Sequence, residues 1–159
     1  MQYPTNSIWK IYIHDKTDRD FSKQSYKRCY VIRSLEDFWR FFNNITSLCN
    51  HQMYFMRSNI PPYYECPENK NGGTLGFVIQ REELVKPTTI QVLVRLIGES
   101  LLPTSQFSQV TGVYLNPKKN GANLRIWCKD YQWLQNNFHQ FKLKDIKALT
   151  TQKIAKHKF

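Results

Sequence analysis

The segment from Pro87 to Gly98 would be apolar on most of its sides if it formed a helix. Pro87, Thr88 and Thr89 are residues that can begin a helix, and Gly98 is one that can end it. The apolar residues between them are Ile90, Val92, Leu93, Val94, Leu96 and Ile97. A helix of this kind needs neighbours around most of its circumference, so we expect it to be the central helix of the fold.

Short runs rich in β-branched and aromatic residues lie on both sides of this segment. They predict strands at residues 8–13, 29–32, 53–56, 75–79, 110–115, 123–128 and 149–154. The pair 110–115 and 123–128 is joined by a basic turn of proline, lysine, asparagine and glycine, which is typical of a hairpin. Strands separated by helices, with a hairpin among them, predict an α+β fold, and 159 residues suit one domain spanning 1–159.

Two further helices are expected. Ser34 precedes Leu35 and two acidic residues, the usual start of a helix, and the apolar positions that follow fall on one face. Trp39 lies at the edge of that apolar face or opposite it, so we expect it to be exposed; the alternative is that it packs beneath a chain terminus. A second helix is predicted at 130–141 on a stripe of aromatic residues.

Charge and composition favour an anionic partner. The net charge is +11 and aromatic residues make up 14% of the chain, a combination suited to RNA, whose bases stack on aromatic rings. No apolar stretch approaches the roughly 20 residues of a membrane-spanning helix and no secretory signal is present, so we expect a soluble cytoplasmic protein that does not bind membranes. The four cysteines have no zinc-site spacing, and we expect reduced thiols, no metal and no cofactor.

Four motifs, in order, resemble the eukaryotic translation initiation factor 4E family from about Tyr3 to Asp130. They are Ser34-Leu35-Glu36-Asp37-Phe38-Trp39, Tyr64-Glu65 with Asn69-Lys70-Asn71-Gly72-Gly73, Leu96-Ile97-Gly98-Glu99-Ser100, and Thr111-Gly112 with Ile126-Trp127. The resemblance implies a strongly curved antiparallel sheet backed by about three helices. It also implies that the concave face binds the 5′ cap of messenger RNA.

The cap guanine carries a delocalised positive charge when it is methylated at N7, and flat aromatic rings on both faces attract it. The resemblance implies that Tyr64 is one ring and that Glu65 accepts hydrogen bonds from the guanine edge. It implies that Trp127 touches the methyl group. For the second ring, Phe21 is the aromatic nearest the expected position and Tyr26 is the alternative, since Phe21 would be unavailable if it lay in the core.

The cap phosphates are expected to meet basic residues near the hairpin. The resemblance makes Lys118 a phosphate ligand, and Lys119 adjoins it. Strand alternation places Arg125 and Asn123 on the same face as Trp127, so Arg125 is expected to meet phosphate as well. The alternative for the two lysines is an ordinary solvated turn.

The opposite side of the molecule is expected to bind a partner helix. The residues that match the family's partner-binding positions are Pro4, Leu35, Trp39, Ile90 and Val94. The implied partners are a scaffold protein resembling initiation factor 4G or a 4E-binding repressor, and the implied role is control of translation initiation. We expect a monomer outside such a complex.

Two other functions have some support in the sequence. Arg81-Glu82-Glu83-Leu84 resembles part of the Nudix hydrolase signature, but Val85-Lys86-Pro87 stands where the signature needs more glutamates and a glycine. No other acid pair or histidine spacing suggests catalysis, so we predict that the protein is not an enzyme and has no catalytic residues. A general single-stranded RNA binder without a cap pocket is the remaining alternative.

Overall fold

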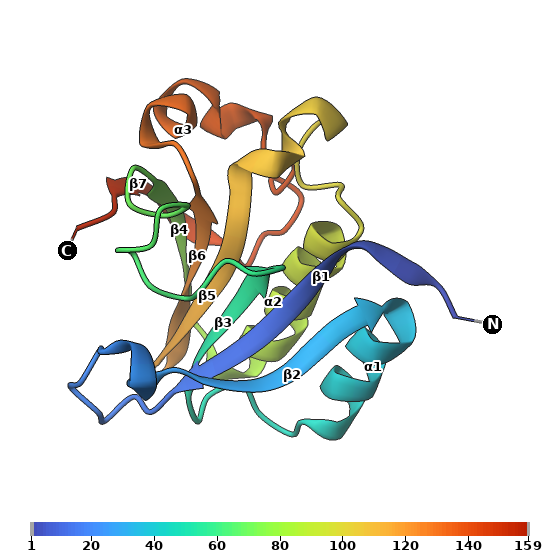
Figure 1. The fold of residues 1–159 in the computed structure, drawn as a ribbon. Coiled ribbons are helices and arrows are strands. Elements are labelled where there is room, and N and C mark those ends of the chain that lie inside the picture. Colours follow the sequence, from blue (N-terminus) through green and yellow to red (C-terminus); the bar gives the residue numbers. More distant parts are fainter. Residues whose placement is uncertain (1, 159) are drawn as a thin grey trace.

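A computed structural model describes residues 2–158, which form one curved seven-stranded sheet with helices on one of its faces (Figure 1). Every pair of neighbouring strands is antiparallel, and their order across the sheet is β2-β1-β3-β5-β6-β4-β7. The strands are β1 (Pro4–His14), β2 (Lys27–Ser34), β3 (Gln52–Arg57), β4 (Gly73–Ile79), β5 (Val110–Lys118), β6 (Gly121–Cys128) and β7 (Thr150–Lys156). The predicted α+β fold with a curved antiparallel sheet is confirmed.

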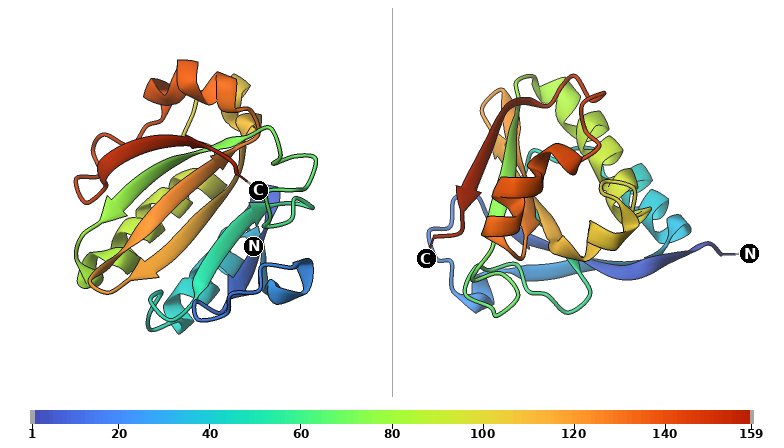
Figure 2. Two further views of the ribbon diagram at one scale, coloured as in Figure 1. Left: turned by 90° about the vertical axis from the view of Figure 1, so that its left-hand side faces the viewer. Right: turned by 90° about the horizontal axis from the view of Figure 1, so that it is seen from above.

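The helices α1 and α2 lie on one side of the sheet, and α3 lies at its end (Figure 2). The helical segments are α1 (Leu35–Asn44), α2 (Glu82–Ile97), α3 (Tyr131–Asn137) and the 3-10 turns η1 (Lys23–Ser25), η2 (Thr104–Gln109) and η3 (Phe138–Gln140). In the described part of the chain no helix has the length and apolar content needed to span a membrane.

Alternation along the central strands sorts side chains onto two faces. Met53 and Phe55 of β3 join the main core beneath the helices, whereas Tyr54 and Met56 join a second buried cluster on the opposite face. Strands β5 and β6 alternate in the same way and contribute Tyr114 and Trp127 to the second cluster. We call the side of the sheet that carries Tyr54, Met56, Tyr114 and Trp127 the open face.

The start of α1 follows the predicted signals. The Ser34 hydroxyl accepts a hydrogen bond from the backbone N–H of Asp37 at 3.1 Å, which satisfies one donor of the first turn. The carboxylate of Glu36 accepts the backbone N–H of Tyr3, so the beginning of β1 is attached to the same helix end. Leu35 N also donates to the Tyr3 carbonyl at 2.9 Å.

The predicted start of the central helix at Pro87 is wrong, because α2 begins five residues earlier at Glu82 and contains Pro87. Proline removes one helical hydrogen bond, which normally favours a place in the first turn. Here Val85 is fully buried in the core and Leu84 packs against it, so burial of the first turn offsets the missing bond. The helix ends at Gly98 as predicted.

The carboxyl-terminal third also departs from the prediction in detail. Helix α3 ends at Asn137 rather than 141, and the chain continues through η3. The hairpin is tighter than expected, since Lys118 pairs directly with Gly121 and only Lys119 and Asn120 form its loop. Strand β7 pairs with β4 at the edge of the sheet and is longer than the predicted segment 149–154.

Replacing the capping serine tests the assignment of the α1 start. We expect Ser34→Ala to lower the free energy of unfolding by about 1 kcal/mol, because the N–H of Asp37 loses its partner. Chemical denaturation followed by circular dichroism measures the change. Ser105→Ala, at an exposed site, is the control; equal stability of the two variants would contradict the capping role.

Candidate functional site

A cavity of about 290 Å³ opens on the open face of the sheet. Five residues predicted from the sequence line it together, namely Phe21, Tyr64, Glu65, Arg125 and Trp127. They come from the loop after β1, the loop after β3, and β6. Tyr26, the alternative to Phe21 as second ring, lines the same cavity.

The floor of the cavity is made of tyrosines that the sequence analysis did not single out. The rings of Tyr54 and Tyr114 stack with centroids 4.5 Å apart and planes at 14°, and Trp127 meets Tyr54 edge-on at 5.8 Å. Burial raises the pKa of Tyr114 to about 12 and raises that of Tyr54 further, so both hydroxyls stay protonated at neutral pH. The floor is therefore aromatic and uncharged.

Phe21 projects into this cavity from an exposed loop. Its side chain is 53% exposed, so the alternative of a place in the core is wrong. One face of the Phe21 ring stacks on His14, with centroids 4.4 Å apart and planes at 6°. His14 is itself buried, and its Nε2 lies 2.8 Å from the Asp20 carbonyl oxygen. Because His14 does not line the cavity, it supports Phe21 from behind.

Tyr64 has a matching support. Its ring stacks on His157 at 4.3 Å and 23°, and it contacts Trp127 at 4.7 Å in a tilted arrangement. His157 lies just beyond β7, and its backbone N–H donates to the Gly72 carbonyl at 3.0 Å. Each candidate stacking ring is thus packed against a histidine ring. The sequence gives no sign of this supporting role, because neither histidine is adjacent in sequence to the ring that it contacts.

Asn69 fixes the loop that carries Tyr64 and Glu65. Its side chain is fully buried, and its amide nitrogen donates to the carbonyl oxygens of Pro61 at 3.1 Å and Tyr63 at 3.0 Å. The Asn69 carbonyl lies 2.6 Å from Nδ1 of His157, so neutral His157 carries its proton on Nδ1 and donates it there. One residue therefore joins this loop to the carboxyl-terminal segment.

The predicted phosphate ligands fall into two groups. Arg125 lines the cavity with Trp127, as strand alternation predicted, and its Cζ lies 5.9 Å from the Tyr114 ring centroid. Arg125 also affects Tyr64: burial raises the pKa of the Tyr64 hydroxyl, and the nearby positive charge of Arg125 partly opposes that rise. Lys118 and Lys119 lie at the tip of the β5–β6 hairpin, and neither lines the cavity. Their phosphate role remains a prediction.

A second cavity of about 280 Å³ adjoins the first and shares Tyr64, Arg125 and Lys158 with it. Its remaining lining comes mainly from β4 and from β7 with the residues that follow it, and it includes Lys153 and Lys156. The segment from Lys142 onward is rich in lysine, but its sequence alone does not indicate that Lys153 and Lys156 line a cavity. The one indication in the sequence is the predicted strand at 149–154, because it contains Lys153 and would place that residue on a sheet face.

The predicted partner-helix positions lie on the other side of the molecule. Leu35 and Trp39 occupy one face of α1 and are 40% and 43% exposed, and Val94 of α2 is 41% exposed. Pro4 pairs with Ser34 directly before α1, and Ile90 is half-buried against the core. Exposure of Trp39, expected from its place off the apolar face, is confirmed.

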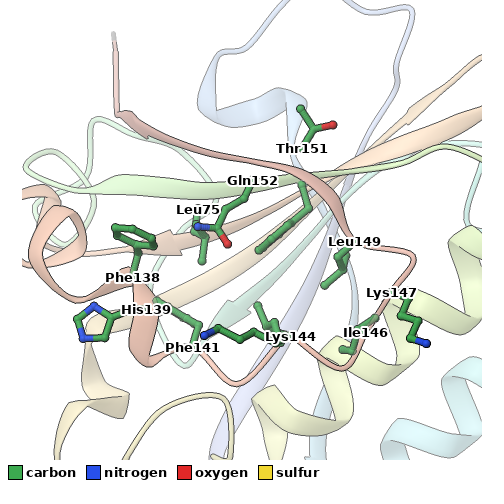
Figure 3. A pocket seen from close by; sticks show the side chains of 12 residues that line it. Leu75, Phe138, His139, Phe141, Lys144, Ile146, Lys147, Leu149, Thr151 and Gln152 are labelled. Carbon is green, nitrogen blue, oxygen red and sulfur yellow. The ribbon is translucent and has the colours of Figure 1, made fainter.

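A third cavity, of about 550 Å³, lies between β4, β7 and the segment that follows α3 (Figure 3). It borders Leu75 and Phe77, which belong to the core beneath the helices, so it lies on the opposite side of β4 from the candidate site. Lys144 and Lys147 stand at its edge.

The residues that resemble the Nudix signature do not contribute to these cavities. Arg81 precedes α2 and forms an ion pair with Glu83 in the first turn. Within residues 2–158 no group of three or more histidine, cysteine, aspartate or glutamate side chains is arranged to hold a metal ion, and the four cysteines are free thiols.

Residues 4–158 match the family model described as Eukaryotic initiation factor 4E. The chain belongs to this family. It is 26% identical over 138 residues to initiation factor 4E-1 of Caenorhabditis elegans, covering 80% of this chain and 63% of that protein. It is 28% identical over 153 residues to initiation factor 4E of Candida glabrata, a match that covers 89% of this chain and 71% of that protein. The chain thus spans a little under two thirds of the Caenorhabditis relative.

Solved structures of family members share the fold. Ascaris suum initiation factor 4E-3, in complex with an m7G cap, superimposes with a TM-score of 0.85 at 19% identity, covering 99% of this chain and 93% of that one. Caenorhabditis elegans initiation factor 4E-3, in complex with the 4E-binding protein Mextli, superimposes with a TM-score of 0.83 at 19% identity. The match covers 99% of this chain and 94% of that one. At such identities the likeness shows the fold.

The His157 support predicts a pH-dependent stability. Burial lowers the pKa of His157 below its usual value of 6.5, although its hydrogen bond to Asn69 opposes this. In the unfolded chain His157 takes up a proton near pH 6.5, whereas in the folded protein it takes up that proton only at a lower pH. The free energy of unfolding is therefore highest above about pH 6.5 and falls as the pH decreases below it. We expect the free energy of unfolding to fall more steeply from pH 7.5 to 5.5 in the wild type than in His157→Phe. Urea denaturation at both pH values measures this, and equal slopes would contradict it.

Proposed function

We propose that this protein binds the 5′ 7-methylguanosine cap of messenger RNA and acts in the control of translation initiation rather than as an enzyme. The observation that carries the proposal is the cavity in which Phe21, Tyr64, Trp127 and Glu65 meet. Family membership and the Ascaris relative described in complex with an m7G cap support it.

The residues divide the recognition between them. Phe21 and Tyr64 stack on the two faces of the guanine, with Tyr26 as the alternative to Phe21, and Trp127 contacts the methyl group. Glu65 is exposed at the cavity and accepts hydrogen bonds from the guanine N1 and exocyclic amine. A methylated guanine is positively charged, so both the rings and the carboxylate favour it over plain guanine. Arg125 meets the phosphates from within the cavity, and Lys118 and Lys119 meet them from the hairpin.

The opposite side of the molecule binds an amphipathic helix under this proposal. Leu35, Trp39 and Val94 present exposed apolar surface, with Pro4 and Ile90 at its margins. The partner is a scaffold resembling initiation factor 4G or a 4E-binding repressor. Support comes from the Caenorhabditis relative described in complex with the 4E-binding protein Mextli. The protein acts in the cytoplasm, as a monomer when no partner is bound.

Removing the carboxylate tests cap recognition. We expect Glu65→Gln to weaken 7-methyl-GTP binding by about 1.5–3 kcal/mol, the usual contribution of hydrogen bonds to a charged group, which is roughly a tenfold to hundredfold rise in Kd. Quenching of tryptophan and tyrosine fluorescence by 7-methyl-GTP and by GTP measures both affinities in the wild type and the variant.

Glu68→Gln removes the same charge from an exposed position of the same loop and should bind as the wild type does. Wild-type protein that binds GTP and 7-methyl-GTP equally would overturn the cap proposal and indicate a general RNA binder instead.

Trp39 tests the partner surface. We expect Trp39→Ala to weaken binding of a 4E-binding helical peptide by about 2 kcal/mol or more, as is usual for a central aromatic contact, while 7-methyl-GTP binding stays unchanged. Isothermal titration calorimetry measures both. Ile8→Ala removes an equally exposed side chain that alternates with the core residue Trp9 and so points away from the helices. Matching affinities for the Trp39 and Ile8 variants would show that the peptide binds elsewhere.

A further inference from the structure

Three residues from three neighbouring strands form a row across the open face. Gly76 of β4 pairs with Arg125 of β6 on one side and with Lys153 of β7 on the other. Paired residues of adjacent strands point to the same face. Strands lie about 4.8 Å apart, so the two cationic residues are separated by about 10 Å at their Cα atoms.

The residue between them has no side chain, which leaves a slot bordered by two positive charges. A Cβ built on Gly76 would lie 3.6 Å from Cγ of Arg125 and 3.6 Å from the carbonyl oxygen of Lys153, both ordinary contacts. A small side chain therefore fits there, but a larger one would occupy the slot. Lys153 is exposed, and the fold holds no charge partner for it among the ion pairs of the described chain.

The cavity of about 280 Å³ over this slot is strongly basic. Arg125, Lys153, Lys156 and Lys158 line it, and none of its lining residues is acidic. It meets the candidate cap cavity at Tyr64, Arg125 and Lys158, which line both. An anion attached to a base in the first cavity can therefore continue directly into the second.

The hairpin is a less direct route for such an anion. Gly121, which pairs with Lys118, lies four residues from Arg125 along β6, a distance of about 13 Å at the spacing of an extended strand. Neither hairpin lysine lines either cavity. Besides Arg125, the basic residue that lines the candidate cap cavity is Lys158, which follows β7.

We infer that the groove over β4 and β7 carries the RNA backbone away from the cap, with the phosphate bridge at Arg125 and the following phosphodiester at Lys153. Gly76 provides the space between these two contacts, and Lys156 and Lys158 add positive charge along the rim. The ligand class is single-stranded RNA joined through its 5′ phosphates to the bound guanosine. This inference rests on the proposed cap binding.

The test compares 7-methyl-GTP with a capped tetranucleotide by fluorescence titration. We expect the wild type to bind the capped tetranucleotide about fivefold or more tightly, because it adds a backbone contact, and its affinity to fall more steeply with salt. Lys153→Ala and Gly76→Val should both remove this advantage, the first by removing charge and the second by filling the slot. Binding of 7-methyl-GTP should stay within about twofold of the wild type in each, since Arg125 is retained.

Lys147→Ala is the matched control, because it removes one positive charge beside the separate cavity on the other side of β4 (Figure 3). It should keep the advantage of the capped tetranucleotide. The salt dependence should fall by about 0.7 in log–log slope in Lys153→Ala, as expected for one lost phosphate contact with a single strand.

The inference is overturned if the wild type binds both ligands equally, or if Lys153→Ala keeps the tetranucleotide advantage while Lys118→Ala removes it. Failure of the proposed function has a separate signature, because the wild type would then not prefer 7-methyl-GTP to GTP. Gly76→Val is accepted as evidence only if its thermal unfolding matches that of the wild type.

Discussion

The period-two alternation of β3, β5 and β6 is the constraint on which the rest of this structure depends. Successive side chains go to opposite faces, so one set of strands supplies both the core beneath α1 and α2 and the aromatic floor of the candidate site. A shift of one residue in the pairing of β3 with β5 would exchange the faces of Tyr54 and Phe55. The hydrophobic core therefore fixes the strand register that also places Trp127 and Arg125 on the open face.

The residues above this floor are held by a few specific contacts rather than by regular structure. Phe21 and Tyr64 come from two irregular loops, and each ring rests on a buried histidine. Asn69 connects the loop after β3 to His157 through three short polar contacts. Rings supported in this way have little freedom to lose, and under the proposed function this favours the affinity for a flat ligand.

Local signals were sufficient where local chemistry decides the structure. The Ser34 cap, the alternating strands and the exposed Trp39 followed from residues close together in the sequence. The start of α2 was misplaced because a rule about proline competed with burial of Val85, which only the packed structure reveals.

The parts that the sequence did not reveal depend on distant pairing. His157 lies 88 residues from Asn69 in the sequence. Lys153 lies across Gly76 from Arg125 only because β7 pairs with the outer edge of β4. A lysine-rich tail has the same composition whether it is solvated or lines a groove. Family resemblance drew attention to Tyr64, Glu65 and Trp127, which line one cavity together, and to the hairpin lysines, which line neither cavity.

The position of β7 as the last strand also sets the order in which the site can be completed during synthesis. Strands β1 to β6 and both covering helices leave the ribosome first and can pair with one another without it. At that stage the core can form, yet Tyr64 lacks the ring behind it and the groove lacks its outer wall. A chain that has folded only as far as β6 therefore lacks the support of the Tyr64 ring and one side of the groove, and the docking of β7 completes both.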